Sequence, residues 1–279
     1  MFAEFKHTIR RMRGSIIGWG IGLFLYALMM SSFYSSMMEL GDEYVTILEN
    51  FPPEMLAFFP SIHNFASPIG YMDTYFFSYM TIIVGIFTVG KGTSLLVGDE
   101  EKGILDLLMA YPVSRTALFW GSMLGFVTAT VIILLVSWIG WIIPAKSAGF
   151  ELTWLEILLP FGPLLAILIL FGSLGLMFSL LLPAGRIASG LTGAILVGNF
   201  LLIGLSGINP DLKPLFKLTP LYYYQGGSAI EELNWMWLGG LIYYTICFLL
   251  IAWWRFQRRD IRVGGEGGWT LPKLFRRSG

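Results

Sequence analysis

Six long runs without a charged side chain constrain this chain more than any other feature of its sequence. Most are near or above the roughly 17 to 25 apolar residues that a helix needs to cross a bilayer. They cover residues 14–38, 74–90, 116–145, 157–185, 187–210 and 233–254. The second run extends to a span over 69–96, with Asp73 near one end and Lys91 toward the other, where a long side chain can reach the membrane surface. The sequence therefore predicts an all-α, polytopic membrane protein with six transmembrane helices.

Composition supports the same class. Hydrophobic residues make up 56% of the 279 positions and the mean hydropathy is +0.71, whereas soluble domains are about 45 to 50% apolar. The formal net charge of zero gives no reason to expect nucleic acid as a partner. Cys247 is the one cysteine and His7 and His63 are the two histidines, so no internal disulfide and no Cys/His zinc site are expected. We expect membrane lipids as partners and no metal.

The distribution of basic residues predicts the orientation of the spans. With both termini in the cytoplasm, all but three of the 18 basic residues fall on the cytoplasmic side; the three are Lys146, Lys213 and Lys217. This asymmetry follows the positive-inside rule. We therefore expect a protein integral to the plasma (inner) membrane, with residues 255–279 as a cytoplasmic tail.

Residues 1–13 combine apolar side chains at helical spacing with basic side chains on the other side. This pattern is typical of an amphipathic helix that lies at the headgroup layer. The alternative is the positive segment of a signal peptide, but the apolar run that follows, 14–38, is long and lacks a clear small-residue cleavage site. We expect an interfacial helix here.

The loop over residues 99–115 is the long polar interruption between the second and third runs. It starts with charged side chains at 99–102 and continues with leucines, including Leu107 and Leu108, on a short helical segment that ends at Pro112. The charged side requires water and the leucine side requires a partner. The pattern predicts a cytoplasmic helix between spans two and three that offers an apolar ridge to a docking protein.

This loop resembles the coupling loop of ABC-2 type permeases, the membrane subunits of ABC exporters. The family pattern is a Glu, a Gly-Thr pair, Leu-Leu and Pro-x-Ser-Arg. It is matched here by Glu101, Gly103, Leu107, Leu108, Pro112, Ser114 and Arg115. The sequence departs at Ile104, where Thr is usual, and at Ser122, where Lys often follows. The spacing of the spans extends the resemblance to nearly the whole chain, as one domain over 1–279.

The resemblance implies several expectations. ATP and Mg would be bound by a separate ABC ATPase subunit and no cofactor by this chain, which would pair with a second permease copy in a homodimer or heterodimer. Leu107 and Leu108 would insert into a groove of the ATPase, oriented by Glu100, Glu101 and Arg115. Spans two and five would face a central cavity, and the candidates for contact with a hydrophobic or amphipathic substrate are Phe77, Tyr79, Met80 and Asn199.

Two other function classes compete with an exporter subunit. An ion-coupled secondary transporter or channel usually carries ionisable groups inside the bilayer, and the central parts of the six spans contain none. A membrane enzyme acting on lipids needs a nucleophile, carboxylate or metal set, and no such motif is found. The segment from Gly85 to Thr93 approaches a phosphate-binding loop, but Gly92 replaces its Ser/Thr and the segment lies within a span. We therefore expect no enzyme activity of its own.

The predicted topology can be tested with reporter fusions. A fusion at Gly265, in the tail, and one near Glu49, in the first loop, should report opposite sides of the membrane. The positive-inside asymmetry is the physical reason. Equal signals from the same side at both positions would contradict the orientation.

Overall fold

The computed structural model describes residues 1–39, 67–101 and 114–258, together with residues 52, 56 and 64. Every regular element in these ranges is helical, and six helices are long and apolar enough to cross a membrane. They are α1 (Phe2–Glu39), α4 to α5 (Pro68–Ser94), α8 (Arg115–Ala145), α9 to α10 (Trp154–Leu181), α11 (Gly185–Ile208) and α13 (Trp235–Arg258). The all-α class and the number of spans agree with the prediction.

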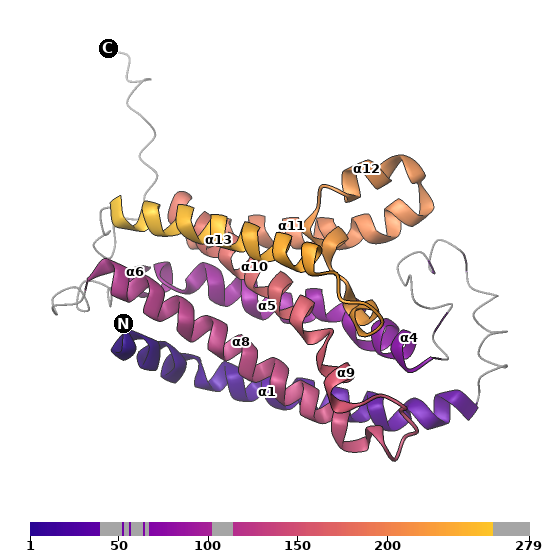
Figure 1. Cartoon of the computed structure of the whole chain (residues 1–279). Helices are drawn as coiled ribbons and strands as arrows, with labels where there is room; N and C mark the ends of the chain where they lie inside the picture. The colour runs from indigo at the N-terminus through magenta and orange to yellow at the C-terminus, as the bar shows by residue number, and fades with distance from the viewer. Residues whose placement is uncertain (40–51, 53–55, 57–63, 65–66, 102–113, 259–279) are drawn as a thin grey trace, which may run out of the picture.

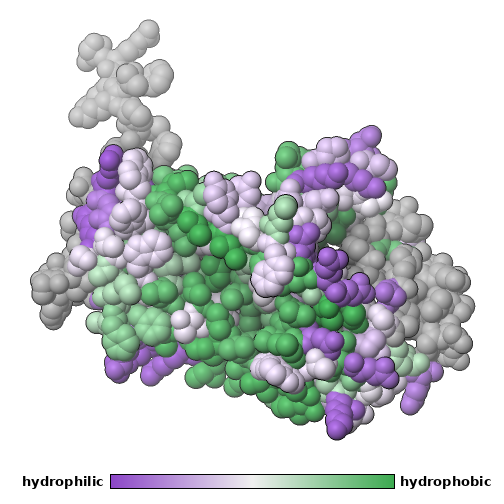
Figure 2. Space-filling view, viewed as in Figure 1, coloured by the Kyte–Doolittle hydropathy of each residue, from purple (hydrophilic) through white to green (hydrophobic). Residues whose placement is uncertain are grey.

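The helices form an elongated bundle (Figure 1). The N-terminus of α1 and the C-terminal end of α13 lie at the same end of this bundle, which we call the terminal end. The molecular surface is consistent with burial in a membrane, because Figure 2 shows a broad band of hydrophobic side chains across the middle and hydrophilic side chains toward both ends. The chain is thus an integral membrane protein by its helices and its surface.

The core of the bundle is α10 (Phe161–Leu181), which packs against α5 (Ser78–Ser94), α8, α11 and α13. Its side chains are mainly apolar around the whole helix and most are buried, as expected for a helix enclosed by others. Glycines allow very close contacts here. A Cβ added to Gly92 of α5 would stand 2.2 Å from the carbonyl oxygen of Gly172 of α10. The backbones of α5 and α10 therefore touch, which fixes the terminal half of α5 on the core.

α1 is held to the bundle chiefly by α8, and the two helices run parallel. α8 contributes Gly121, Gly125 and Gly140 to the contact. An added Cβ at Gly125 would lie 2.8 Å from Thr8, and one at Gly140 would lie 2.6 Å from the carbonyl oxygen of Phe24. In lipid, close packing over small residues takes the place of the hydrophobic driving force between helices. The position of α1 therefore depends on these three glycines.

One difference from the sequence analysis concerns residues 1–13. α1 runs without a break from Phe2 to Glu39, so the first turns are not a separate helix. Glu4, Thr8 and Met12 are buried, because this side faces the glycines of α8. The basic side chains of these turns, such as Arg10 and Arg13, are exposed. A position at the membrane interface stays a prediction for this segment.

The second span changes its winding near the end opposite the termini. It begins with α4 (Pro68–Met72), continues as the π-helix η2 (Asp73–Phe77) and becomes α5 (Ser78–Ser94). A short helix, α6 (Val97–Glu101), follows it at the terminal end. The predicted coupling helix continues into residues 102–113, which lie outside the described residues.

α11 and α13 are joined by residues 209–234 at the end opposite the termini. The segment folds into short turns of helix: η3 (Pro210–Leu212), α12 (Lys213–Phe216), η4 (Pro220–Tyr223) and η5 (Gly226–Ile230). Asn234 closes it, because its side-chain oxygen accepts hydrogen bonds from the amides of Met236 and Trp237 at the start of α13. The fixed start of α13 anchors the whole segment.

The α1–α8 contact can be tested with Gly125→Ala. The added Cβ collides with Thr8, and overpacking of this kind costs about 1 to 3 kcal/mol. In detergent, the purified variant should aggregate at a lower temperature than the unmodified chain. The measurement is the temperature at which half of the protein is lost from the monodisperse peak in size-exclusion chromatography. Gly239→Ala on α13 is the matched control, since nothing lies within 4 Å of its added Cβ. Equal transition temperatures for the two variants would contradict the packing.

Candidate functional site

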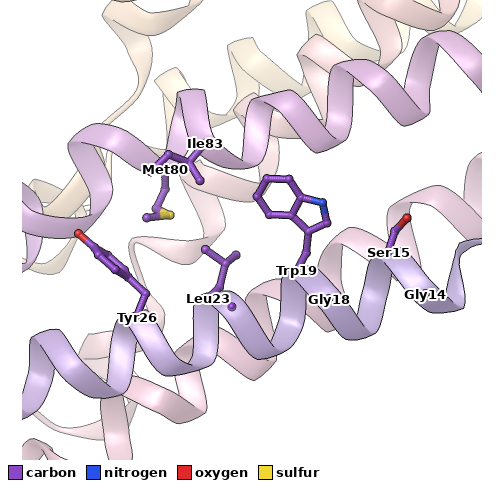
Figure 3. Close-up of a pocket in the computed structure, with 9 residues that line it drawn as sticks. Gly14, Ser15, Gly18, Trp19, Leu23, Tyr26, Met80 and Ile83 are labelled. Carbon is purple, nitrogen blue, oxygen red and sulfur yellow. The ribbon is translucent and has the colours of Figure 1, made fainter.

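A cavity of about 530 Å³ lies between α1 and α5. This volume falls in the range of about 300 to 1,000 Å³ that is usual for small-molecule sites. Figure 3 shows Trp19, Leu23 and Tyr26 of α1 reaching toward Met80 and Ile83 of α5 across this space. The lining is mainly apolar, and we call the cavity the α1–α5 groove.

The floor of the groove is formed by Gly14, Gly18 and Gly22 of α1. Residues four apart lie on one side of a helix, so these glycines leave a strip of α1 without side chains. Nothing lies within 4 Å of a Cβ added to any of them. The three glycines of α8 differ, because residues of α1 occupy the space beside them. The strip is open space rather than a packing contact within the chain.

Contacts between α1 and the second span bound the groove. Toward the end opposite the termini, the Tyr26 hydroxyl donates a hydrogen bond to the carbonyl oxygen of Tyr75. Near the middle, the rings of Trp19 and Phe87 lie 6.0 Å apart. At the terminal end, Arg11 donates from Nη2 to the carbonyl oxygen of Leu95 at 3.0 Å. Contacts between α1 and the second span therefore bound the groove at both of its ends.

Of the four predicted substrate residues, Met80 lines the groove. Phe77 is fully buried and packs edge-to-face against Phe161 at 5.2 Å between ring centroids. Tyr79 is partly exposed and is not among the lining residues. The structure therefore brings one of these four side chains to the cavity.

Asn199, the fourth candidate, lies on α11 and away from the groove lining. Its Nδ2 donates to the carbonyl oxygen of Ile195 at 2.8 Å. Its Oδ1 is buried and has no hydrogen-bond partner among the described residues. An acceptor without a partner in an apolar surrounding is costly. Its role in a substrate path stays a prediction.

None of the residues that α1 contributes to the groove was among the predicted site residues. The signal was present in the spacing of Gly14, Gly18 and Gly22. Glycines at this spacing predict close packing of another helix. In the structure α8 packs against a different side of α1, at Gly20 and Ala27. The pairing of α1 with α5 across an open groove could not be read from either helix alone.

At the terminal end, Arg115 joins the start of α8 to the end of α13. Its Nη1 donates to the carbonyl oxygens of Phe256 and Gln257, both at 3.2 Å. Gln257 in turn donates to the Thr116 hydroxyl at 2.8 Å. A cation at the last carbonyls of a helix also interacts favourably with the helix dipole. Arg115 is therefore engaged within the chain and couples α8 to α13.

The structure describes only some of the other residues that were predicted to couple the chain to the ATPase. Glu100 is buried, with 7% of its surface exposed. Ser114 caps α8 by accepting a hydrogen bond from the Ala117 amide. Gly103, Leu107, Leu108 and Pro112 lie outside the described residues, as does the side chain of Glu101.

A metal site is not supported by the part of the chain that the structure describes. Within these ranges, no group of three or more His, Cys, Asp or Glu side chains is placed to hold an ion. The groove itself is lined by glycine and by apolar and aromatic side chains, with Ser15, the Tyr26 hydroxyl and the indole N–H of Trp19 as its polar groups. The arrangement suits binding of an apolar molecule, and the lining holds no Asp, Glu, His, Lys or Cys side chain to activate a hydroxyl for catalysis.

Comparison with known proteins identifies the class of this arrangement. A family model described as ABC-2 family transporter protein matches residues 3–261. The chain is also similar to the uncharacterized membrane protein YdbK of Bacillus subtilis (strain 168), with 23% identity over 213 residues. That match covers 70% of this chain and 84% of the relative.

Proposed function

The chain belongs to the ABC-2 family of transporter proteins, and we propose that it is the permease subunit of an exporter for a hydrophobic or amphipathic substrate. As an ABC-2 membrane permease domain it carries no catalytic site, and the family implies that ATP is used on a partner subunit. In this proposal ATP and Mg bind to the separate ATPase. The terminal end faces the cytoplasm and a second permease copy completes the pathway.

The α1–α5 groove is the observation that carries the substrate class. It lies between two candidate spans, and its walls are Leu23, Met80, Ile83 and the rings of Trp19 and Tyr26. Ile83 is 37% exposed and the glycine strip is open, so a molecule dissolved in the membrane can enter from the side. Apolar walls favour a substrate that partitions into the bilayer. Trp19 and Ile83 would contact it directly, whereas only 1% of the surface of Met80 is exposed.

An ion-coupled transporter or channel was the competing class. Such proteins carry Asp, Glu, Lys, Arg or His side chains along the path through the bilayer, and the groove lining contains none of these. Asp73 and Lys91 lie toward the two ends of the second span. The energy for transport is therefore assigned to the partner ATPase.

The route from that ATPase to the spans runs through the loop that follows α6. In the proposal, Leu107 and Leu108 insert into a groove of the ATPase, while Glu100, Glu101 and Arg115 orient the loop. Arg115 supports this role because it bonds the end of α13. A force on the loop would then reach two helices together, α8 and α13.

The groove can be tested with Gly18→Leu. The new side chain extends from the floor of the groove, and its Cβ meets nothing within 4 Å. We expect apolar compounds that co-purify with the chain, and substrate-stimulated turnover by the partner ATPase, to fall about tenfold or more, the equivalent of 1.4 kcal/mol. Mass spectrometry of the purified chain and ATPase assays of the complex measure the two effects.

The control for this variant is Gly239→Leu on α13, which belongs to neither span two nor span five. Its added Cβ also meets nothing within 4 Å, and the residue does not line the groove. Both variants should show the expression and stability of the unmodified chain. A loss of equal size in both, or in neither, would remove the groove from the substrate path.

The coupling loop can be tested with Leu107→Ala/Leu108→Ala. If both leucines are buried in the ATPase, their truncation removes roughly 1.5 to 3 kcal/mol of apolar burial for each side chain. Co-purification of the ATPase and its stimulated turnover should both drop at equal membrane expression. Leu215→Ala/Leu218→Ala, exposed at the opposite end of the bundle, is the matched control. Unchanged pull-down of the ATPase and unchanged turnover in the first variant would show that this loop does not couple the ATPase to the spans.

A further inference from the structure

The second span contains a π-helix, Asp73–Phe77, whose cause is not in its own sequence. The segment reads DTYFF and has neither proline nor glycine. π-helical turns are rare and occur frequently at functional sites. The Ser78 amide donates to the carbonyl of Asp73, five residues back, which is the hydrogen bond of this wider turn. Contacts from outside the span must therefore stabilise it.

Residues 224–227, which belong to the segment between α11 and α13, supply two of these contacts. The Asp73 carboxylate accepts a hydrogen bond from the Gly227 amide at 2.6 Å. The Tyr224 hydroxyl donates to the carbonyl oxygen of Phe77 at 3.1 Å. Burial raises the pKa of Tyr224 well above its usual value and the charge of Asp73 adds to the rise, so this hydroxyl stays protonated as a donor. We call residues 224–227 the latch.

The latch fits against Asp73 because it contains two glycines. Gly226 has a φ of +52°, a backbone conformation that glycine adopts at little cost. A Cβ added to Gly227 would lie 2.6 Å from the Cβ of Asp73 and 3.1 Å from the carbonyl oxygen of Ile69. Any side chain at position 227 would therefore push the latch away from the π-helix.

The π-helix holds one buried polar side chain without a partner. The hydroxyl of Thr74 is buried, and among the described residues it has no hydrogen-bond partner. In an α-helix, a threonine hydroxyl can bond a carbonyl three or four residues back. The hydroxyl of Thr81, in the regular helix α5, is likewise buried without a partner among the described residues, so Thr74 does not by itself favour one winding over the other.

We propose that the latch holds the second span in its π form and that its release converts this turn to α-helix, which opens the outer end of the transport path. A π turn holds about one residue more than an α turn, so the conversion rotates one part of the span against the other by about 100°. The terminal half of α5 is fixed on α10 through Gly92 and Gly172. The rotation therefore falls on the outer residues, Pro68–Met72. The role in opening the path rests on the proposed transport function.

The latch is connected to the rest of the bundle through α13. The Gln225 side chain accepts from the Asn234 amide at 2.6 Å and donates to its carbonyl oxygen at 3.1 Å. Asn234 also caps α13. At its other end α13 accepts the hydrogen bonds from Arg115. A displacement of α13 along its axis would therefore pull on the latch.

The test uses a cysteine at position 74 as a reporter. Thr74→Cys is introduced in a Cys247→Ser background, which removes the one native cysteine. Labelling by a membrane-impermeant maleimide is followed on the full chain, purified alone. Thr74 is 4% exposed, so labelling should be slow while the latch is closed. Gly227→Ala and Tyr224→Phe should each raise the rate about tenfold or more, because each removes a contact worth that factor.

Two matched controls separate the latch from general loosening. Tyr223→Phe removes a neighbouring hydroxyl with no hydrogen bond to the π-helix, and Gly240→Ala adds a Cβ where nothing lies within 4 Å. Both should leave the labelling rate within about twofold. Unchanged labelling rates in both Gly227→Ala and Tyr224→Phe would overturn the proposal. Tyr224→Phe adds no atoms to the core, so this variant can be tested even if Gly227→Ala does not fold.

The gating role is tested on the complex with the partner ATPase. Addition of ATP should raise the labelling rate at position 74, and equal rates with and without ATP would overturn the gate. A failure of the proposed function has a different signature. In that case no ATPase would co-purify with the chain, whereas labelling of the chain alone would still respond to the latch variants.

Discussion

The structure depends on one constraint, which is that hydrocarbon offers no hydrogen-bond partner to the polypeptide backbone. An unpaired amide or carbonyl there costs several kcal/mol, so the spans are helices that satisfy their own backbone. The second span departs from regular winding at Asp73–Phe77. At this place other elements supply side chains: Tyr26 and Tyr224 donate to carbonyl oxygens of the π-helix. The exception thus satisfies the same constraint through tertiary contacts.

The number and class of the spans could be predicted from the sequence because charge and hydropathy are local properties. A lysine or glutamate in the centre of a span is costly wherever the neighbouring helices lie. The course of α1 depends on its partner and could not be predicted in this way. Its first turns look amphipathic, but Gly121 and Gly125 of α8 accept the side with Glu4 and Thr8. The helix therefore continues from Phe2 without a break.

The candidate site was predicted in part for the same reason. Met80 was identified from the second span and lines the groove, whereas Asn199 does not. The floor at Gly14, Gly18 and Gly22 arises because α1 packs on α8 by one side and leaves the other open toward α5. The π-helix could not be predicted from the sequence, because no proline or glycine occurs within Asp73–Phe77. Its stabilising partner, Tyr224, lies 147 positions further along the chain.

α13 is the element that relates the two ends of the molecule. It spans 24 residues, or about 36 Å at the rise of an α-helix. Arg115 bonds its last carbonyls, and Asn234 fixes its first turn to Gln225. A helix resists stretching because each turn is closed by hydrogen bonds, so a displacement at one end appears at the other. Coupling between distant sites requires an element with two discrete states. In the proposed exporter the turn at Asp73–Phe77 is that element, and α13 biases it from the end where the ATPase docks.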